Sequence, residues 1–349
     1  MAFLYGREWK KEELLNSVGR PEALADIRLS ELSDGPGRNV RVADIHTGSG
    51  LFFTVLLDRG MDIGPARYRG IPLSFFSSTG IRSPYFYESR GYGWQKNFHG
   101  GLLTLCGLSA AGHPSIDERF GEHGLHGRVS NTPAENVNVY KEWKNDEFEL
   151  SITGEVREAW VFGFNLVMRR KIIVRLGQSV ISVQDEFENL DTDEAPLMLL
   201  YHCNFGFPIV SEGSSFLVND RKIEARDETA QQGLDRYDKV EAPQAGYEEQ
   251  VFYHDPEEDK NGYAECSLRN LSIDHGKQLE TYVKYRKKEL PELLEWKQMG
   301  VKDYAFGMEP ANCRPEGRAE ELEKGRLKII KSGEIVRTAI EIGIRNERS

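Results

Sequence analysis

The sequence predicts a mainly β fold, in which one large antiparallel β domain carries a few short helices. Apolar and polar residues alternate with a period of two in many segments after residue 39, as in strands with one buried face. Short turns that contain glycine join successive segments of this kind, which is typical of antiparallel hairpins. No strand–helix–strand rhythm recurs in the 349 residues, so a parallel α/β sheet is not expected.

Residues 1–30 have a helical pattern instead. Four apolar side chains follow roughly helical spacing among lysines and glutamates, namely Trp9, Leu14, Leu15 and Val18. The pattern stops near Gly19 and Pro21, which are residue types that end helices. We therefore expect a helical N-terminal extension over residues 1–30, followed by a single β-sandwich domain over residues 31–349.

Strands are predicted along the rest of the chain. The apolar run Leu51–Leu57 indicates a buried strand, and residues 148–160 alternate between apolar and polar side chains. Residues 166–174 and 180–187 are two strand-like segments separated by a short turn with one glycine, which predicts a hairpin. Residues 327–344 repeat this arrangement near the C-terminal end.

One helix is predicted between these strands. The segment Glu289–Gly300 has Pro291 where the first turn of a helix would lie and Gly300 where the helix would end. Proline fits the first turn because the N–H that it lacks has no partner there, and glycine favours the C-terminal end. We therefore expect a helix over this range.

Composition limits the class of protein. The 45 lysines and arginines against 56 aspartates and glutamates give a formal net charge of −11. A nucleic-acid binder needs a basic surface that displaces counterions from phosphates, so nucleic acid is not an expected partner. Hydrophobic residues make up 39% of the chain, which is enough for a large core and too many for a disordered protein.

Several features favour a cytoplasmic protein. Charge appears by Arg7, before an apolar signal segment could form, and the run Leu51–Leu57 is far shorter than the ~20 residues of a membrane-spanning helix. Four cysteines are widely scattered without Cys-x-x-Cys spacing, at Cys106, Cys203, Cys266 and Cys313. Reduced thiols are the expected state, and a membrane is not an expected partner.

One glycine-containing segment resembles a cofactor-binding loop. Val42–Gly50 has the outline of the Asp-x-Gly-x-Gly loop of nucleotide-binding methyltransferases, whose glycines let backbone N–H groups approach the cofactor. However, His46 stands where the first glycine belongs, and a strand-like run follows instead of a helix. A hairpin turn between two strands is the better interpretation.

Histidines and a carboxylate beside glycines and aromatic residues form the strongest chemical signal. They occur in four segments, which are His99-Gly100-Gly101, His123-Gly124-Leu125-His126, Tyr201-His202-Cys203-Asn204 and Gly307-Met308-Glu309-Pro310. Taken singly, a histidine beside a strand is most often a packed, hydrogen-bonded residue. The two histidines at 123 and 126 lack the helical His-Glu-x-x-His context of a zinc site, so no metal is expected.

In their order along the chain, these segments resemble the aldose 1-epimerase, or galactose mutarotase-like, superfamily, and in particular its DUF4432 branch. The likeness extends from about Asn39 to Ile344. It implies a large antiparallel β-supersandwich with a few short helices. It also implies a small sugar or sugar derivative as substrate, and neither a metal nor an organic cofactor.

The resemblance assigns roles to individual residues. His202 falls on the general acid of the mutarotases and Glu309 on their general base. His126 matches the histidine that holds the sugar, and His99 competes for that role. The Asn-His-Thr-Tyr pattern of the mutarotases is here Tyr201-His202-Cys203-Asn204, so the contacts around the acid differ.

Other residues are candidates for substrate binding. They are Arg128 beside His126, Asn204 beside His202, Asp255 in the region of a substrate-binding aspartate, and Arg59 in a segment typical of the branch. Arg59, Arg82 and Arg128 would suit a phosphate, sulfonate or carboxylate on the sugar, because a guanidinium binds an oxyanion through two hydrogen bonds. Structural or surface ion pairs are an equally good interpretation of these arginines.

Exchange between sugar anomers needs one acid and one base. The base removes the proton of the anomeric hydroxyl while the acid protonates the ring oxygen, and the opened chain rotates and closes on its other face. We therefore expect an aldose 1-epimerase-type isomerase, with His202 and Glu309 separated by a sugar-sized gap of about 5–8 Å. A non-catalytic carbohydrate-binding protein, or an isomerase or lyase of open-chain sugars, is the alternative. Edge strands of such a sandwich would permit a homodimer.

Overall fold

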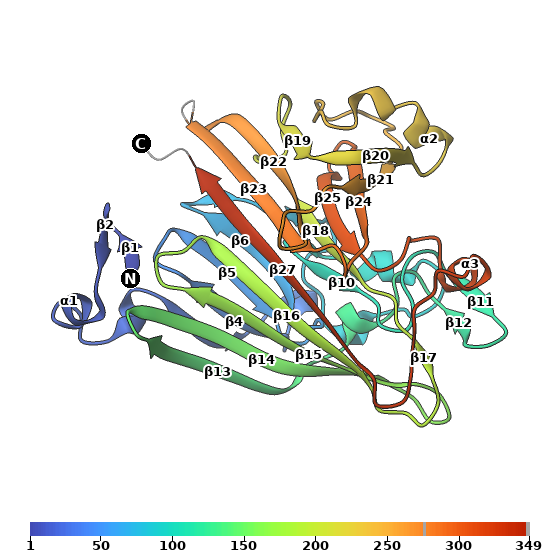
Figure 1. Cartoon of the computed structure of the whole chain (residues 1–349), viewed down its shortest axis with the longest axis horizontal. Helices are drawn as coiled ribbons and strands as arrows, with labels where there is room; N and C mark the ends of the chain where they lie inside the picture. Colours follow the sequence, from blue (N-terminus) through green and yellow to red (C-terminus); the bar gives the residue numbers. More distant parts are fainter. Residues whose placement is uncertain (275–276, 347–349) are drawn as a thin grey trace.

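Antiparallel strands pair into sheets throughout the computed structural model, which describes residues 1–274 and 277–346 and confirms the mainly β prediction. Eight strands form the largest sheet, and most of them are long and run side by side across the molecule (Figure 1). In spatial order they are β13 (Glu135–Lys144), β14 (Glu147–Ala159), β15 (Asn165–Arg175), β16 (Val180–Asn189), β27 (Ile335–Asn346), β23 (Lys277–Arg286), β22 (Tyr263–Asp274) and β19 (Ser215–Val218). The predicted hairpin of residues 166–187 is confirmed as β15 and β16.

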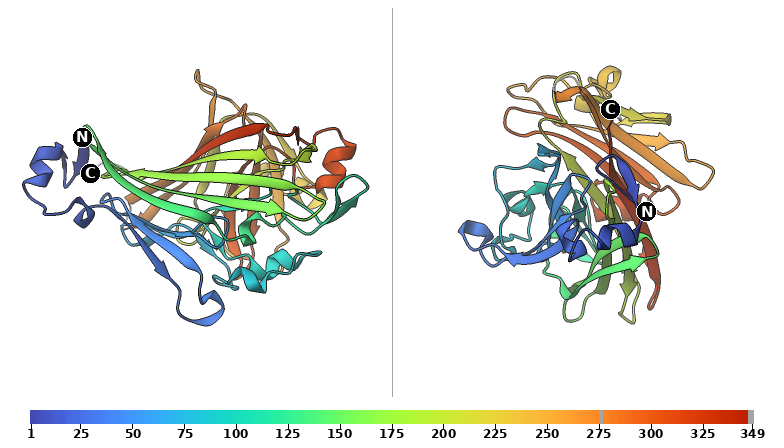
Figure 2. Two further views of the ribbon diagram at one scale, coloured as in Figure 1. Left: turned by 90° about the horizontal axis from the view of Figure 1, so that it is seen from below. Right: turned by 90° about the vertical axis from the view of Figure 1, so that its left-hand side faces the viewer.

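A six-stranded sheet packs against the largest sheet, and the two sheets contribute to the same hydrophobic core. The two views of Figure 2 show the long strands curving over these shorter ones. In spatial order the six strands are β10 (Thr104–Cys106), β18 (Leu200–Phe205), β25 (Tyr304–Ala311), β24 (Glu292–Met299), β21 (Gln250–Pro256) and β20 (Asp220–Ala225).

The N-terminal half of the chain adds a five-stranded sheet and several small elements. The sheet consists of β3 (Asp26–Glu31), β4 (Arg41–His46), β5 (Leu51–Leu56), β6 (Asp62–Tyr68) and β7 (Ile71–Pro72). The hairpin predicted at Val42–Gly50 is confirmed, because β4 pairs directly with β5. Four strand pairs complete the fold: β1 (Ala2–Leu4) with β2 (Arg7–Trp9), β8 (Phe75–Phe76) with β9 (Gly100–Gly101), β11 (Ser115–Asp117) with β12 (Gly121–His123), and β17 (Ala195–Pro196) with β26 (Ile329–Ile330).

Helices in the described residues are short. They are α1 (Lys11–Leu15), α2 (Glu228–Gln231) and α3 (Arg318–Glu323), together with 3-10 turns at Pro21–Ala23, Gly35–Gly37, Pro84–Phe86, Gly93–Asn97, Val129–Asn131 and Leu234–Arg236. Across residues 1–274 and 277–346, no helix has the length and apolar character needed to cross a membrane.

The N-terminal 30 residues differ from the helical extension that the sequence predicts. Only α1 is an α-helix, and it is preceded by the β1–β2 hairpin and followed by a 3-10 turn and β3. The hairpin turn lies at Tyr5 and Gly6, whose φ angles of 52° and 84° are both positive. Two consecutive positive φ angles fit the tight turn that suits the right-handed twist of paired strands.

The helix predicted over Glu289–Gly300 is wrong, because the structure has strand β24 there. Leu294 and Trp296 pack into a small cluster on one face of the strand, whereas Leu293 packs into the main core on the other face. A strand buried on both faces shows no clean polar–apolar alternation, so a short apolar segment of this kind is easily mistaken for a helix.

Residues of β18 alternate between two environments. Tyr201, Cys203 and Phe205 point into the main core between the sheets, whereas Leu200 joins the small cluster on the opposite face. Successive side chains of a strand point to opposite faces, so His202 lies on the same face as Leu200. The core contacts of the odd-numbered residues therefore fix which face His202 occupies.

A buried ion pair connects β18 to the largest sheet. Arg170 on β15 donates two hydrogen bonds to Asp185 on β16, from Nε to Oδ1 at 2.9 Å and from Nη2 to Oδ2 at 2.7 Å. The hydroxyl of Tyr201 donates to Asp185 Oδ2 at 2.6 Å. Because charged groups inside a protein are stable only when paired and hydrogen-bonded, this network holds β18 in one position against the sheet.

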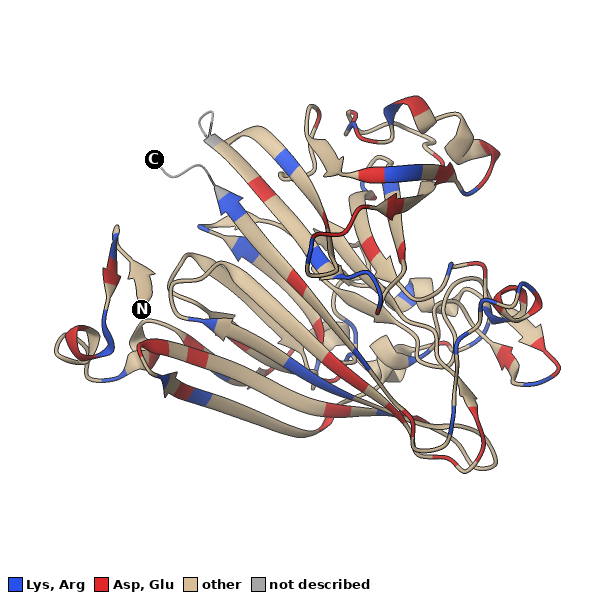
Figure 3. Ribbon diagram, in the orientation of Figure 1, with Lys and Arg blue, Asp and Glu red and all other residues tan. Residues whose placement is uncertain are grey.

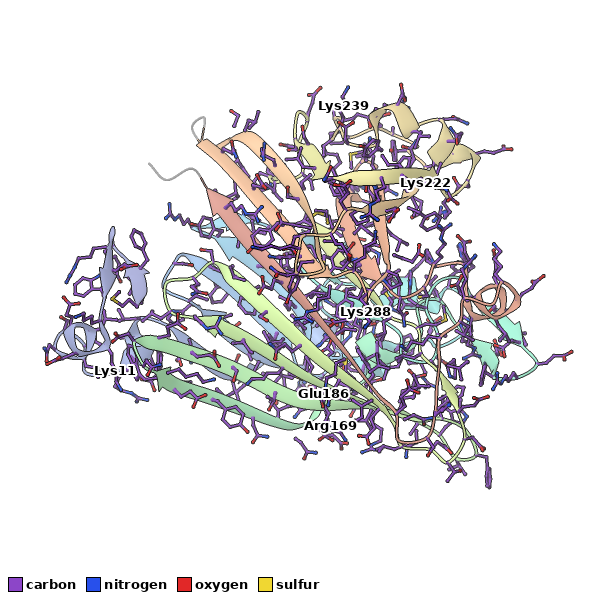
Figure 4. All side chains as sticks on the ribbon, viewed as in Figure 1. Lys11, Arg169, Glu186, Lys222, Lys239 and Lys288 are labelled. Carbon is purple, nitrogen blue, oxygen red and sulfur yellow. The ribbon has the colours of Figure 1, made fainter. Side chains whose placement is uncertain are left out.

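Charges on the exposed face of the largest sheet are paired along neighbouring strands. Lysines and arginines alternate there with aspartates and glutamates (Figure 3). Arg169 on β15 and Glu186 on β16 occupy opposite register positions (Figure 4), and Arg169 Nη1 donates to Glu188 at 2.5 Å. Exposed pairs of this kind contribute only about 0–1 kcal/mol each, so the buried core and the buried ion pairs dominate stability.

His254 on β21 forms a second buried ionic cluster. Its Nδ1 lies 2.6 Å from Asp220 Oδ2 and its Nε2 lies 3.1 Å from Glu295 Oε2, and its side chain is fully buried. Burial opposes the charged imidazolium, but the hydrogen bonds to Asp220 and Glu295 outweigh burial and raise the pKa of His254 to about 9. The imidazolium therefore persists at neutral pH.

We predict that His254 makes stability depend on pH between about 6.5 and 9. A folded-state pKa above the ordinary value of 6.5 gives a stabilising contribution that is complete below pH 6.5 and disappears as the pH rises through 9. The full contribution is about 3 kcal/mol. Denaturant unfolding across this range should show a falling free energy of unfolding in the parent and a flatter curve in His254→Gln. His46→Gln, at the end of β4, is the matched control, and equal slopes in all three proteins would contradict the prediction.

Candidate active site

A cavity of about 190 Å³ opens on the face of the six-stranded sheet that points away from the main core. Strands β18, β21, β24 and β25 form its floor, and loops around residues 92–98, 112–113, 125–126 and 315 form its walls. Its lining residues are Tyr92, Trp94, Gln95, Phe98, Gly112, His113, Leu125, His126, His202, Arg226, Glu249, Val251, Leu294, Trp296, Glu309 and Pro315. Three residues that the sequence singled out, His126, His202 and Glu309, are among them.

His202 and Glu309 are neighbours across two paired strands. The register of β18 and β25 pairs Leu200 with Ala311 and Cys203 with Met308, so position 202 lies opposite position 309. Side chains opposite each other in an antiparallel pair lie on the same face with Cβ atoms about 4.5–5.5 Å apart. His202 Nδ1 accordingly lies 3.0 Å from Glu309 Oε1.

The predicted gap of about 5–8 Å between these two groups is therefore wrong. The ring oxygen and the anomeric oxygen of a sugar are bonded to the same carbon, so an acid and a base that serve them can stand side by side. Nδ1 and Oε1 are close but not aligned for a hydrogen bond, and within the described chain both remain without a hydrogen-bond partner. His202 Nε2 and Glu309 Oε2 are then the atoms left to face a ligand.

Gly307 provides the space that the Glu309 carboxyl group occupies. Both residues lie on the same face of β25, two positions apart. A Cβ atom at position 307 would lie 2.4 Å from Glu309 Oε1 and 2.9 Å from the Cβ atom of Trp296. A side chain at position 307 would therefore displace the carboxyl group from His202.

Aromatic rings surround His202. The ring centroid of His202 lies 5.2 Å from Trp296, 5.6 Å from Phe98 and 6.0 Å from His126. Trp94 stacks on Phe98 at 4.5 Å and lies 4.6 Å from His126. Faces of aromatic rings in a small cavity suit a ligand with exposed C–H groups, and the few polar groups among them fix its orientation.

His126 is held in a single protonation state by the backbone. Its Nδ1 accepts a hydrogen bond from the N–H of Gly112 at 3.3 Å, so the proton of the neutral ring lies on Nε2. Burial lowers the pKa of His126 well below its ordinary value, and the neighbouring His202 and His113 lower it further. His126 therefore offers one N–H donor. The residue adopts a positive φ of 56° in the loop that presents it to the cavity.

Burial also favours the neutral forms of His202 and Glu309. It raises the pKa of Glu309 well above the ordinary value of 4.5, and the nearby Glu249 raises it further while Arg226 lowers it. Burial lowers the pKa of His202 to about 3, against a smaller opposing effect of Asn204. At a pH between the lowered pKa of His202 and the raised pKa of Glu309, the two groups together hold one proton, which lies on the carboxyl group when the cavity is empty.

The structure places two other predicted ligand residues behind the cavity. His99 is fully buried and lies against Gly101, with neither ring nitrogen hydrogen-bonded within the described chain. Asn204 is buried on β18, and its Nδ2 donates to the backbone oxygen of His202 at 2.8 Å. Neither residue lines the cavity. Asn204 supports the strand around His202.

The predicted arginine and aspartate ligands are also elsewhere. Arg59 is buried and donates to three backbone oxygens, those of Ser130, Arg82 and Asn97, at 2.7–2.8 Å. Arg128 lines a neighbouring cavity, and the guanidinium of Arg82 lies over the ring of Phe86. Asp255 pairs with Lys287 near the end of β21. The structure therefore does not bring these residues to the cavity that His202 and Glu309 line.

The sequence analysis missed several residues that line the cavity. Arg226, Glu249 and Trp296 lie on or beside strands β20, β21 and β24, and Tyr92, Gln95 and His113 come from loops. Trp296 was included in the wrongly predicted helix. Glu249 and Arg226 lie in strongly charged stretches, in which nothing distinguishes a cavity residue from a surface residue.

Comparisons with known proteins support the fold. A crystal structure from Klebsiella pneumoniae, described as a candidate aldose 1-epimerase, superimposes with a TM-score of 0.84 at 25% identity and covers 91% of this chain and 83% of that chain. A galactose mutarotase-like protein from Clostridium acetobutylicum gives a TM-score of 0.63 at 13% identity, covering 93% and 99%. A galactose 1-epimerase from Lactobacillus acidophilus gives 0.59 at 9% identity, covering 93% and 100%. Because their identities to this chain are so low, the Clostridium and Lactobacillus structures support the fold alone.

No curated protein matches the chain in sequence. The profile of the family described as domain of unknown function DUF4432 matches residues 37–344, which is most of the 349 residues. The chain therefore belongs to the DUF4432 family and has the sandwich fold of galactose mutarotase-like proteins.

Proposed function

We propose that the protein interconverts the anomers of a small sugar by acid–base ring opening. Glu309 is the base and His202 is the acid, and His126 donates a hydrogen bond to the sugar through Nε2. One observation carries this proposal: a carboxyl group and an imidazole lie 3.0 Å apart on the floor of a small cavity with aromatic walls. Such a pair can remove a proton from one oxygen and give a proton to the next.

The proton count of the pair fits the reaction. In the reactive form, Glu309 is a carboxylate and His202 is an imidazolium. Ring opening moves the anomeric hydroxyl proton to Glu309 and the Nε2 proton of His202 to the ring oxygen, so the pair ends as a carboxylic acid and a neutral imidazole. Closing the ring on the other face reverses both transfers and restores the starting form. The reaction therefore needs no external proton donor.

Burial assists ring opening in this arrangement. Moving the two protons neutralises both side chains, and neutral side chains are the forms that a buried site favours. The cost of holding a carboxylate and an imidazolium in the cavity is thus relieved as the ring opens. Trp296, Phe98 and Trp94 supply apolar surface for the C–H faces of the sugar and exclude water from the pair.

We predict that Glu309→Gln and His202→Asn each lower the rate of anomer exchange by about 10²–10⁴-fold, because each variant removes one proton transfer. The rate is measured by NMR exchange between the α and β anomers across a panel of aldoses. Glu12→Gln, on α1 at the far end of the molecule from the cavity (Figure 1), is the matched control. Circular dichroism should show that all three variants are folded.

Each alternative has its own result in this experiment. Saturable sugar binding without faster anomer exchange in the parent protein would favour a non-catalytic carbohydrate-binding protein. A new ketose or an unsaturated product would identify an isomerase or lyase. Full exchange activity in either Glu309→Gln or His202→Asn would reject the assigned roles.

We predict that kcat/KM falls on the alkaline side, with a midpoint at a pH above 4.5. The free enzyme must keep the one proton that Glu309 and His202 share, and burial together with Glu249 raises the pKa at which Glu309 loses this proton above that ordinary value. Activity should therefore decrease as the pH rises through the raised pKa. The pH dependence of the anomer exchange rate, corrected for the spontaneous rate at each pH, tests this sign. Activity that instead decreases as the pH falls through this pKa would contradict it.

We predict that Gly307→Ala impairs activity more than stability. The new methyl group would lie 2.4 Å from the end of the Glu309 side chain, which can rotate away, and 2.9 Å from the Cβ atom of Trp296, which needs only a small shift of β24. That movement takes the carboxyl group away from His202, and kcat should drop by at least about 10-fold because misplaced reacting groups lose much of their effect. Gly19→Ala, where a Cβ atom would have no neighbour within 4 Å, is the control. Unchanged kcat in Gly307→Ala would show that this spacing is not needed.

A further inference from the structure

Glu249 is a cavity-lining carboxylate that the proposed proton transfers do not use. It lies directly before β21, and its side chain is 45% exposed. Its Oε2 accepts a hydrogen bond from Trp296 Nε1 at 2.8 Å, and its Oε1 accepts one from Arg226 Nη2 at 3.3 Å. A single carboxylate therefore connects an aromatic wall of the cavity to the arginine that lines it.

The bond to Trp296 fixes a ring that packs on the proposed acid. The indole meets the ring of His202 edge to face, with centroids 5.2 Å apart and planes inclined by 78°. The Cβ atom of Trp296 also borders the space beside Gly307 that the Glu309 carboxyl group occupies. Rotation of the indole would loosen both proposed catalytic groups, so its N–H anchor sets their positions.

The bond to Arg226 holds a guanidinium that could otherwise form an ion pair with the Glu309 carboxylate. Arg226 lies after β20 and lines the same cavity as Glu309, and its guanidinium is held by Asp227 at 2.8 Å and by Glu249. If the guanidinium turned to Glu309, an ion pair would stabilise the carboxylate and make it a poor proton acceptor. Glu249 and Asp227 keep Arg226 paired at the side of the cavity and leave Glu309 free of a cationic partner.

We propose that Glu249 is a positioning residue that holds Trp296 against His202 and keeps the Arg226 guanidinium away from Glu309. This inference rests on the proposed function for its catalytic consequence. Its physical content is independent of turnover, because it concerns the protonation of Glu309 and the position of one indole.

The groups that surround Glu309 allow the effect of Glu249 on its protonation to be measured separately. Facing it are His202 on β18, Cys106 on β10, Arg226 after β20 and Glu249 before β21, and Cys203 lies nearby on the other face of β18. His126 and His113 line the same cavity. Burial raises the pKa of both cysteine thiols well above their ordinary value, so the thiols stay neutral. Glu249 and Arg226 are the charged pair among these groups whose balance can be altered without touching His202 or Glu309.

Two substitutions separate the charge of Glu249 from its hydrogen bond. Glu249→Gln removes the charge but keeps an oxygen that can accept from Trp296 Nε1, whereas Trp296→Phe keeps a ring but removes the N–H donor. Glu249→Gln should lower the pKa of Glu309 by about 0.5–1 unit, because a nearby negative charge is lost and Arg226 is released. Trp296→Phe should leave this pKa in place. Glu248→Gln, an exposed neighbour hydrogen-bonded to Thr229, is the matched control.

The first readout is the pH titration of the Glu309 carboxyl carbon by NMR in protein labelled at glutamate, with the signal assigned by its loss in Glu309→Gln. The expected result is a lower pKa in Glu249→Gln and the parent value in Glu248→Gln and Trp296→Phe. An unchanged pKa in a folded Glu249→Gln protein would overturn the proposal. This measurement stands even if the parent accelerates no anomer exchange, which would reject the proposed function alone.

The second readout is the pH profile of anomer exchange. In Glu249→Gln the alkaline limb of kcat/KM should move to lower pH by the same 0.5–1 unit, and the plateau should fall by about 3-fold because the base is weaker. In Trp296→Phe the limb should stay in place while KM rises. A purely structural role for Glu249 would lower the thermal stability of Glu249→Gln without moving the limb, and that result would also overturn the proposal.

Discussion

The pairing of β18 with β25 is the constraint on which the candidate site depends. It sets position 202 opposite position 309 and thereby brings an imidazole and a carboxyl group within 3.0 Å. A slip of one residue would turn one of the two side chains into the core, because neighbouring residues of a strand point to opposite faces. Tyr201, Cys203 and Met308 prevent this slip by packing into the core. The bond from Tyr201 to the buried Arg170–Asp185 pair fixes β18 to the largest sheet.

Sequence patterns predicted the pairing of strands that are adjacent in the chain, but not the pairing of strands that are far apart in it. Hairpins such as β4–β5 and β15–β16 are visible because the two strands and their turn are adjacent in the chain. The β18–β25 pairing joins segments about a hundred residues apart, and no local pattern reports it. The expectation of a gap between acid and base failed for this reason. The strand β24 was mistaken for a helix because core residues cover both of its faces.

Among the site residues, the sequence could indicate histidines and a glutamate, but it could not show what an arginine binds. The guanidinium of Arg59 donates to three backbone oxygens in the interior. Every residue has a backbone oxygen, so such acceptors cannot be recognised from the sequence. Glu249 and Trp296 were missed because only a tertiary hydrogen bond, between β24 and the residue before β21, joins them at the cavity. Contacts of this kind are set by tertiary packing. Residue type and spacing therefore indicated three residues that line the cavity, but not the groups that hold them in position.

Two buried histidines of the six-stranded sheet show how the fold assigns opposite protonation states. His254 lies between two carboxylates, and these hydrogen bonds keep it charged with a pKa raised to about 9. His202 lies beside a single carboxyl group that is itself driven toward its neutral form, and burial lowers its pKa to about 3. A proton on His254 is fixed and serves stability. His202 and Glu309 hold no such fixed charge, because burial favours the neutral form of both groups, and the proposed ring opening uses this property to move protons between the pair and a sugar.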